Sequence, residues 1–390
     1  MEVILKIVAD VNIPHVAECF GSIGDVVVVS GRQMTRQLVC NADILLVRSI
    51  TKVDRNLLAG SSVRFVGTAT IGVEHVDVDY LSAEGIGFAS APGSNANSVA
   101  EYMVAALLCA ARKKKIVLSG MTAGIVGAGN VGSRVEKKLR ALGMRPVLND
   151  PPLQRQSGDA KYRPLEEIFE CDFVTLHTPL MLDGIDRTFH LADEGFFRSL
   201  KTGCVFANSS RGAVVDTAAL KAAIAAGNLG GAIIDVWENE PNINVELLRM
   251  VDISTPHIAG YSLDGKIAGM IMIYRAVCRH FGLEAKYSTA DFLPEALVKQ
   301  IETDERCDDE QETLHQTVQQ VYAINRDDFN TREIAMVAAD ERGRFFDDLR
   351  KNYAVRREFQ NTRAVVKDAS SSLAHKLAGI GFVVEQEQQI

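Results

Sequence analysis

The sequence lacks any apolar run that approaches the roughly 18 residues needed to span a bilayer. Its first residues, 1–6, are too short and too acidic for a signal peptide, and they have the pattern of a first strand. We therefore expect a cytoplasmic protein that does not bind a membrane.

Positive charge is also scarce. Lysine and arginine total 42 against 50 aspartates and glutamates, which gives a formal net charge of −8. The one notable basic block, Arg112-Lys-Lys-Lys115, follows an apolar segment and should extend a helix on its solvent side. This balance argues against nucleic acid as a partner.

Cysteine pairs and clusters of metal ligands are missing as well. The seven cysteines are scattered, with no C-x-x-C, which is typical of reduced thiols in the cytoplasm. The segment Glu74-His-Val-Asp-Val-Asp79 contains possible ligands, but its place between a strand and a helix favours turn and capping roles. We expect no metal site.

What the chain does contain is a repeated strand–helix pattern. Short apolar runs alternate with helix-like stretches, and residues 98–115 form a long helical pattern rich in Ala and Leu that should be largely buried. This alternation predicts parallel sheets covered by helices. The expected strands are 4–9, 26–29, 44–48, 65–67 and 87–89, and then 124–127, 146–149, 173–177, 204–208, 231–235 and 252–254.

The chain changes character after about residue 285. Residues 297–320 are polar and acidic, and charged helical stretches such as 341–358 alternate later with short apolar runs at 364–366 and 382–384. The arginine-rich pattern of this tail is typical of a solvated helix face. We expect a separate α+β module with no chemistry of its own.

The glycine motif Gly127-Ala-Gly129-Asn-Val-Gly132 lies between a predicted strand and a predicted helix. In such a turn the first glycine permits the tight bend, the second lets the backbone approach a pyrophosphate, and the third lets helix and strand pack closely. The N–H groups at the helix start then face the phosphates.

Asp150 ends the next predicted strand. A carboxylate at this place suits both hydroxyls of an adenosine ribose and repels a 2′-phosphate. The motif therefore predicts NAD, rather than NADP, as the cofactor, against the alternative of a glycine-rich turn in some other α/β protein.

Three further residues lie in loops that follow predicted strands, where function concentrates: Arg211, Glu240 and His257. Taken singly, they could be a surface ion pair, a turn residue and a structural histidine. Together with an NAD motif they fit the oxidation of an alcohol, since histidine can take the hydroxyl proton. A carboxylate can orient the imidazole, and arginine can clamp a substrate carboxylate.

The predicted fold is α/β, with two doubly wound parallel-sheet (Rossmann-like) domains, a cleft between them and a C-terminal α+β domain. The first domain, for substrate, should comprise 1–100 and 258–285. The NAD-binding domain should comprise 101–257, and the C-terminal domain 286–390.

The motifs resemble those of the D-isomer-specific 2-hydroxyacid dehydrogenases over about residues 3–285. The resemblance implies that His257 is the acid/base, Glu240 its partner and Arg211 the carboxylate anchor. The cofactor positions that carry over are Gly127, Gly129, Asn130, Val131, Gly132, Asp150, Thr178, Ser209, Asp235 and Gly260. The motifs are Gly124-Ile-Val-Gly-Ala-Gly-Asn-Val-Gly132, His177-Thr-Pro-Leu180, Ser210-Arg-Gly-Ala-Val-Val-Asp216, Asp235-Val-Trp-Glu-Asn-Glu-Pro241 and Pro256-His-Ile-Ala-Gly260.

Further motifs, which extend to Leu349-Arg-Lys-Asn-Tyr-Ala-Val-Arg-Arg-Glu358, are similar to one subfamily of these dehydrogenases. That resemblance implies a homodimer formed through the C-terminal domain and a phosphorylated four-carbon 2-hydroxy acid as substrate. Ser49, Thr70 and Tyr261 match positions that contact substrate there. The acidic stretch 302–312 has no obvious counterpart.

A phosphorylated acid needs cationic groups for both of its ends. Arg211 would serve the carboxylate, and Arg48 is our candidate for the phosphate, with a surface ion pair as the alternative. Two other functions stay open, namely a relative that acts on a three-carbon phosphorylated acid and a non-catalytic NAD sensor. The intact set of Arg, Glu and His argues against the sensor.

Overall fold

The computed structural model describes residues 4–303 and 309–387. By its internal contacts the chain forms two compact units, Met1–Asn95 with Ser262–Pro294, and Ala96–Tyr261 with Glu295–Ile390. Residues 295–390 thus group with the central segment, whereas the three domains of the sequence analysis, and the cleft, stay a prediction. Each unit is described by itself.

The first unit is built on a five-stranded parallel sheet in the order β2-β1-β3-β4-β5. The central strand β3 is buried along its whole length, as a parallel strand covered on both faces requires. The strands are β1 Leu5–Asp10, β2 Gly24–Val29, β3 Ile44–Val47, β4 Phe65–Thr68 and β5 Gly87–Ala89; the helices are α1 Val16–Phe20, α2 Arg36–Val39, α3 Arg55–Leu58, α4 Val78–Ala83 and α12 Leu263–Phe281.

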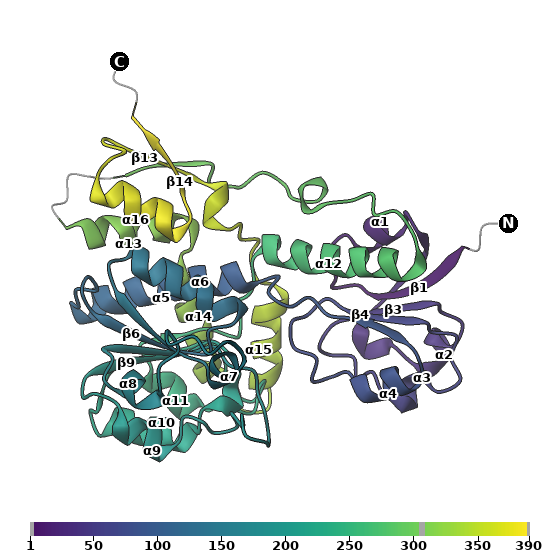
Figure 1. The fold of residues 1–390 in the computed structure, drawn as a ribbon, viewed down its shortest axis with the longest axis horizontal. Coiled ribbons are helices and arrows are strands. Elements are labelled where there is room, and N and C mark those ends of the chain that lie inside the picture. Colours follow the sequence, from purple (N-terminus) through teal and green to yellow (C-terminus); the bar gives the residue numbers. More distant parts are fainter. Residues whose placement is uncertain (1–3, 304–308, 388–390) are drawn as a thin grey trace. The chain divides into compact units, whose positions relative to one another are not determined.

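The second unit contains a six-stranded parallel sheet in the order β11-β10-β9-β8-β6-β7. Helices α5 and α6 cover one face, and α8 to α11 cover the other (Figure 1). The strands are β6 Thr122–Val126, β7 Arg145–Asn149, β8 Phe173–Leu176, β9 Cys204–Asn208, β10 Leu229–Ile234 and β11 Ile253–Ser254; the helices are α5 Ala96–Lys114, α6 Asn130–Ala141, α7 Pro151–Ser157, α8 Leu165–Phe169, α9 Glu194–Ser199, α10 Thr217–Ala225 and α11 Val245–Met250. All of the strands predicted for this part of the chain are present within a few residues of their expected ends.

The order in which the chain adds strands to this parallel sheet reverses between β6 and β8. From β6 the chain crosses to β7 on one side and then returns to β8 on the other side. Ligands of open α/β sheets bind at the carboxyl ends of the strands at such a point. Gly127 and Thr178 both lie there, just beyond two strands that pair through Val126 and Leu176.

A third sheet, β12-β13-β14, is also parallel and belongs to the C-terminal segment. Its first strand, at the start of the polar stretch, was not expected from the sequence. Part of the acidic stretch 302–312, residues 304–308, lies outside the described residues. The strands are β12 Gln300–Glu302, β13 Arg363–Val366 and β14 Val383–Gln386; the helices are α13 Glu310–Val321, α14 Ile324–Arg332, α15 Arg342–Lys351 and α16 Ser372–Ile380.

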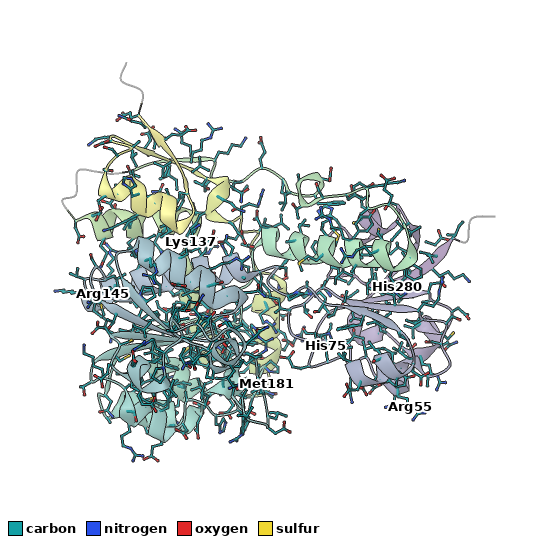
Figure 2. All side chains as sticks on the ribbon, in the orientation of Figure 1. Arg55, His75, Lys137, Arg145, Met181 and His280 are labelled. Atoms are coloured by element: carbon teal, nitrogen blue, oxygen red, sulfur yellow. The ribbon has the colours of Figure 1, made fainter. Side chains whose placement is uncertain are left out.

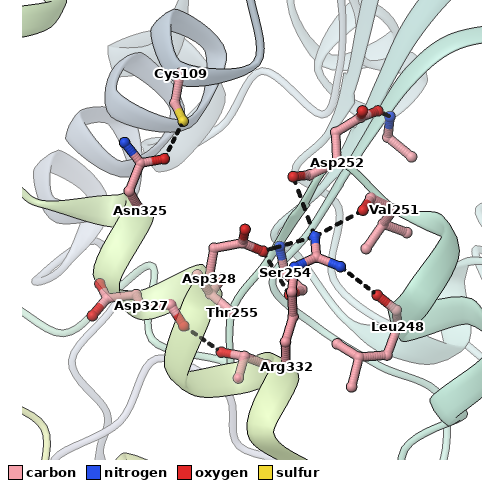
Figure 3. Close-up of polar contacts among 12 residues, drawn as sticks. Cys109, Leu248, Val251, Asp252, Ser254, Thr255, Asn325, Asp327, Asp328 and Arg332 are labelled. Atoms are coloured by element: carbon pink, nitrogen blue, oxygen red, sulfur yellow. Dashed lines mark hydrogen bonds and ion pairs between the residues drawn. The ribbon is translucent and has the colours of Figure 1, made fainter. Parts of the chain in front are cut away.

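The C-terminal segment packs closely on the six-stranded sheet of its own unit. In Figure 3, Asp328 of α14 accepts hydrogen bonds from the N–H and the hydroxyl of Ser254 in β11, each 2.8 Å long. Arg332 donates to the carbonyl oxygens of Leu248 and Val251 at 3.0 and 2.9 Å. Charge-assisted bonds therefore fasten α14 to the sheet edge.

The basic block at the end of α5 also contacts this segment. Arg112 pairs with Glu312 at 2.8 Å, and Lys113 pairs with Asp328 at 3.4 Å. The block does extend the helix to Lys114, as predicted, but its cations bind carboxylates of the chain itself.

Helix α5 is buried on all sides, from Val99 to Ala111, because the sheet covers one side and α13 and α14 lie against it elsewhere. The sequence analysis predicted a largely buried helix here, and this is confirmed. Within the described residues, no helix is both long and apolar enough to cross a membrane, and the six cysteines there are free thiols.

One charged residue, Glu101, lies in the middle of this apolar helix with no exposed surface. Its carboxylate accepts bonds from Arg356 Nη1 at 3.2 Å and from the N–H of Phe359 at 2.9 Å, with Lys138 Nζ 4.0 Å away. Burial raises the pKa of Glu101, and the Arg356 guanidinium opposes that rise.

The interpretation of the arginine-rich tail as a solvated helix face is therefore wrong for Arg356. Helix α15 ends at Lys351, whereas the sequence predicted a helix over 341–358. Residues 352–358 are therefore not helical, and the side chain of Arg356 is buried. The physical reason is the buried carboxyl group of Glu101, which accepts a hydrogen bond from Arg356 and which a local sequence pattern does not reveal.

We predict that Arg356→Ala lowers the free energy of unfolding by about 3–5 kcal/mol, because it leaves the buried Glu101 carboxyl with only the more distant Lys138 as a cation. Urea unfolding followed by the fluorescence of Trp237, the only tryptophan, would measure this. Arg363→Ala is the matched control, since that side chain is 60% exposed and its ion pair with Glu385 is long, 3.6 Å. A loss below about 1 kcal/mol for Arg356→Ala would contradict the prediction.

Candidate active site

The glycine turn between β6 and α6 is built around close backbone contacts. Gly127 has φ +88°, and a Cβ there would lie 2.6 Å from the carbonyl oxygen of His177. A Cβ at Gly132 would lie 2.0 Å from the carbonyl oxygen of Gly127. Gly129, the N-cap of α6, has open space beside it. Only glycine fits the first and third positions, and the second leaves room for a ligand.

Asp150 holds this turn as well as ending β7. One carboxylate oxygen accepts the N–H of Ala128 at 2.8 Å, and the other caps α7 by accepting the N–H of Leu153 at 3.0 Å. Its charge therefore lies beside the glycine turn, where a dinucleotide ribose would be bound.

The end of β8 offers a polar atom with no partner among the described residues. The Oγ1 atom of Thr178 is buried there without a hydrogen bond. Buried polar groups are normally paired, so this hydroxyl is suited to a ligand. Its neighbour His177 is neutral, because burial lowers the pKa of the imidazole to about 3. The glycine cradle and this hydroxyl fit a dinucleotide cofactor.

The loop after β9 is organised by Asn208. Its side-chain oxygen accepts the N–H and hydroxyl of Ser210 at 3.0 and 2.8 Å, and its amide donates to the carbonyl of Arg211 at 3.0 Å. Ser209 lies between them, with its hydroxyl 3.6 Å from the sulfur of Met103. The sequence analysis noted Asn208 as a strand end but missed this role, for which an Asn before two serines is the available signal.

The loops that carry Arg211 and Glu240 touch each other at a glycine. A Cβ at Gly212 would lie 1.9 Å from the carbonyl oxygen of Trp237, so the two loops touch through their backbones. The indole of Trp237 is buried and donates to the carbonyl of Thr255 at 2.9 Å.

His257 and Glu240 form a hydrogen-bonded pair. His257 Nδ1 lies 2.7 Å from Glu240 Oε2, while Glu240 Oε1 accepts the N–H of Trp237 at 2.7 Å. Burial raises the pKa of Glu240, but the facing imidazole and these bonds outweigh burial, and the net pKa is lowered. An ionised carboxylate only accepts, so Nδ1 carries the proton and Nε2 is left to exchange a proton with a substrate.

Asp235 fixes the loop that carries His257. Its carboxylate accepts the hydroxyl of Thr255 at 2.7 Å and the N–H groups of Ile258 and Ala259 at 2.8 and 3.1 Å. Its carbonyl oxygen accepts the N–H of His257 at 2.7 Å, where φ is +58°. Burial raises the pKa of Asp235, against the lowering effect of His257 and these bonds.

The same loop ends at Gly260 and Tyr261, both half-buried. Most of the second unit's predicted residues are therefore on loops at the carboxyl ends of its strands. Asn130 and Val131 begin α6 directly after the glycine turn.

The remaining predicted residues lie in the first unit, at the carboxyl ends of the neighbouring strands β3 and β4. Arg48 donates to the carbonyl of Asn12 at 3.4 Å and, among the described residues, pairs with no carboxylate, while Ser49 is exposed. The hydroxyl of Thr70 lies 2.7 Å from that of Thr68, which in turn lies 2.9 Å from the ring of His75. His75 is labelled in Figure 2.

Comparison with known proteins agrees with this geometry. The profile of the D-isomer specific 2-hydroxyacid dehydrogenase NAD binding domain matches residues 100–259, and a domain of unknown function, DUF3410, matches residues 292–381. An erythronate-4-phosphate dehydrogenase of Cronobacter sakazakii is 44% identical over 96% of this chain and 97% of its own. One of Escherichia coli is 42% identical over 97% and 98%.

Solved structures share the fold. An NAD⁺-bound 3-phosphoglycerate dehydrogenase of Entamoeba histolytica has a TM-score of 0.62 at 25% identity, covering 75% of this chain and all of that one. A D-lactate dehydrogenase of Aquifex aeolicus, complexed with NAD and lactic acid, has a TM-score of 0.60 at 23% identity, covering 71% and 96%.

Fold, glycine turn and sequence together define an NAD-dependent enzyme of the D-isomer-specific 2-hydroxyacid dehydrogenase class. The similarity extends over nearly the whole length of the curated relatives, including the C-terminal segment. Within this class, the chain belongs to the erythronate-4-phosphate dehydrogenase family.

We predict that Glu240→Gln lowers kcat/KM by about 10²- to 10⁴-fold, the range typical of lost acid–base catalysis. The amide N–H₂ would face Nδ1, so the proton would move to Nε2 and the wrong tautomer would result. Steady-state rates across pH would measure the loss. Glu238→Gln is the matched control, because Glu238 pairs with His190 instead, at 2.7 Å. Equal, small losses in both variants would argue against the pair.

We also predict that Asp150→Ser raises the NADP-to-NAD ratio of kcat/KM by about 10- to 100-fold, since a carboxylate a few ångströms from a 2′-phosphate repels it by a few kcal/mol. Serine can still cap α7, so the fold is kept. Rates with both cofactors would test this, and an unchanged ratio would place Asp150 away from the ribose.

Proposed function

We propose that this protein oxidises 4-phospho-D-erythronate with NAD to 2-oxo-3-hydroxy-4-phosphobutanoate, in the cytoplasm, as a step of pyridoxal 5′-phosphate (vitamin B6) biosynthesis. The observation that carries the proposal is the 42–44% identity to erythronate-4-phosphate dehydrogenases along almost the full chain. The contact between His257 and Glu240 supports it, because alcohol oxidation needs such a base.

In the proposed mechanism, His257 Nε2 takes the proton of the substrate's C2 hydroxyl. Glu240, at 2.7 Å from Nδ1, stabilises the imidazolium that forms and holds the ring in place. NAD, when bound, supplies the nicotinamide C4 that accepts the hydride from C2. Returning the proton from Nε2 to solvent completes the cycle for the protein.

Arg211 is the proposed anchor of the substrate carboxylate. A guanidinium can hold a carboxylate with two parallel hydrogen bonds and polarise the adjacent oxygen. The bonds of Asn208 to Ser210 and Arg211 support this role, since they order the loop before substrate arrives.

The proposed cofactor contacts divide by chemistry. The glycine turn and the start of α6 would hold the pyrophosphate, Asp150 the ribose, and Asp235 the carboxamide side of the nicotinamide. Three hydrogen bonds already engage the Asp235 carboxylate, so its remaining lone pairs are those available to a ligand. The full set is Gly127, Gly129, Asn130, Val131, Gly132, Asp150, Thr178, Ser209, Asp235 and Gly260.

Arg48, Ser49, Thr70 and Tyr261 are proposed as further substrate contacts. Among the residues that the structure describes, Arg48 has one long bond, to a backbone carbonyl, so its guanidinium is suited to an anion.

We propose a homodimer formed through the C-terminal segment. Support comes from large apolar side chains that are exposed there, in a part of the chain rich in charge. These are Leu297, Phe329, Met336 and Val355.

The test is turnover by purified protein with 4-phospho-D-erythronate and 3-phospho-D-glycerate side by side. A 2-oxo acid is added in parallel reactions in case NADH stays bound, and product rather than absorbance is followed in those. Preference for the four-carbon acid is expected. Preference for the three-carbon acid would contradict the proposed substrate, but it would be consistent with the proposed catalytic residues.

We predict that His257→Ala lowers kcat by about 10²- to 10⁴-fold, because it removes the proposed acceptor of the hydroxyl proton. NAD affinity, measured by quenching of Trp237 fluorescence, should stay near that of the wild type. Activity within a few fold of the wild type would remove His257 from the mechanism.

A further inference from the structure

Helix α15 of the C-terminal segment packs on the loop that carries Glu240. A Cβ at Gly343 would lie 2.7 Å from the side-chain oxygen of Asn242 and 3.3 Å from the ring of Pro241. Phe346, one turn further along, is fully buried in the hydrophobic cluster that contains Trp237. The helix therefore belongs to the wall of the site region within this unit.

Arg350, in the last turn of α15, lies close to the loops that carry Glu240 and Tyr261. The guanidinium carbon of Arg350 lies 5.9 Å from the ring centroid of Tyr261, a proposed substrate contact. Arg350 is also among the groups that lower the pKa of Glu240, after burial, which raises it, and His257. Arg350 is thus a cation whose field reaches the Glu240 carboxylate.

The hydrogen-bonding capacity of this guanidinium is largely unused. Its Nε is buried and has no partner among the described residues. Its nearest carboxylate is that of Asp347, with Nη1 and Oδ1 4.0 Å apart, and the side chain is 26% exposed. Leaving a charged donor unpaired costs free energy that a bound anion would recover.

We infer that Arg350 binds the phosphate of the substrate, so that the C-terminal segment supplies a residue of the active site. This rests on the proposed function, in which the substrate is phosphorylated. A phosphate carries about −1.5 to −2 charges at pH 7, so beside the ionised Glu240 it needs a cation. Arg211 is proposed for the carboxylate, and Arg350, which lies beside Tyr261 and whose field reaches Glu240, is proposed for the other end.

The test compares Arg350→Ala and Arg350→Lys with the wild type on 4-phospho-D-erythronate and on unphosphorylated D-erythronate. Arg344→Ala is the matched control, because Arg344 is on the same helix and 87% exposed. For Arg350→Ala we expect KM for the phosphorylated acid to rise about 10- to 100-fold, the effect of one lost charge-assisted bond. Rates with D-erythronate should change by less than about 3-fold, and Arg350→Lys should recover part of the loss.

Competition by inorganic phosphate gives a second readout that does not need the proposed substrate. Phosphate should inhibit the wild type against whichever 2-hydroxy acid it oxidises, and Arg350→Ala should weaken that inhibition by a similar factor. Failure of the wild type to oxidise 4-phospho-D-erythronate would sink the proposed function alone. Equal losses on both erythronates, or unchanged phosphate inhibition, would overturn the role of Arg350.

Discussion

The arrangement of the site depends on one buried carboxylate, that of Asp235. It is costly to bury, since desolvation favours its neutral form, and three hydrogen bonds offset that cost. In return those bonds define the path of residues 255–259, and with it the left-handed backbone of His257. The bonds of Asp235 to this loop hold the imidazole of His257 where it can contact Glu240 at 2.7 Å. A residue expected to touch the cofactor is thus also the support of the base.

Glycines impose a second constraint, because they let loops from distant strands touch. Gly127 lies against the carbonyl of His177, and Gly212 lies against that of Trp237. Each contact joins two strand ends at one edge of the sheet, so residues far apart in sequence share a site. The glycines allow the loops to lie this close, while the residues beside the glycines supply the functional side chains.

The sequence predicted what depends on local pattern. Strands such as 204–208 and the long helix after residue 95 were expected nearly where they lie, because buried parallel strands and apolar helices have distinct compositions. The proposed site residues rest on motifs and resemblance. The inward turn of Arg356 could not be predicted, because its partner Glu101 lies 255 residues earlier. Strand β12 was missed because only Ile301 of its three residues is buried.

The two-sided burial of α5 has a consequence for synthesis of the chain on the ribosome. Helix α5 emerges early, but Arg356 and Phe359, which meet Glu101, follow it by some 255 residues. Since the ribosome adds about 5–20 residues per second, some tens of seconds pass between the synthesis of α5 and that of the segment that contacts Glu101. Until then the nascent chain exposes apolar surface that is buried in the folded protein. A chain that ends before α13 and α14 would leave this apolar surface uncovered and would be prone to aggregate.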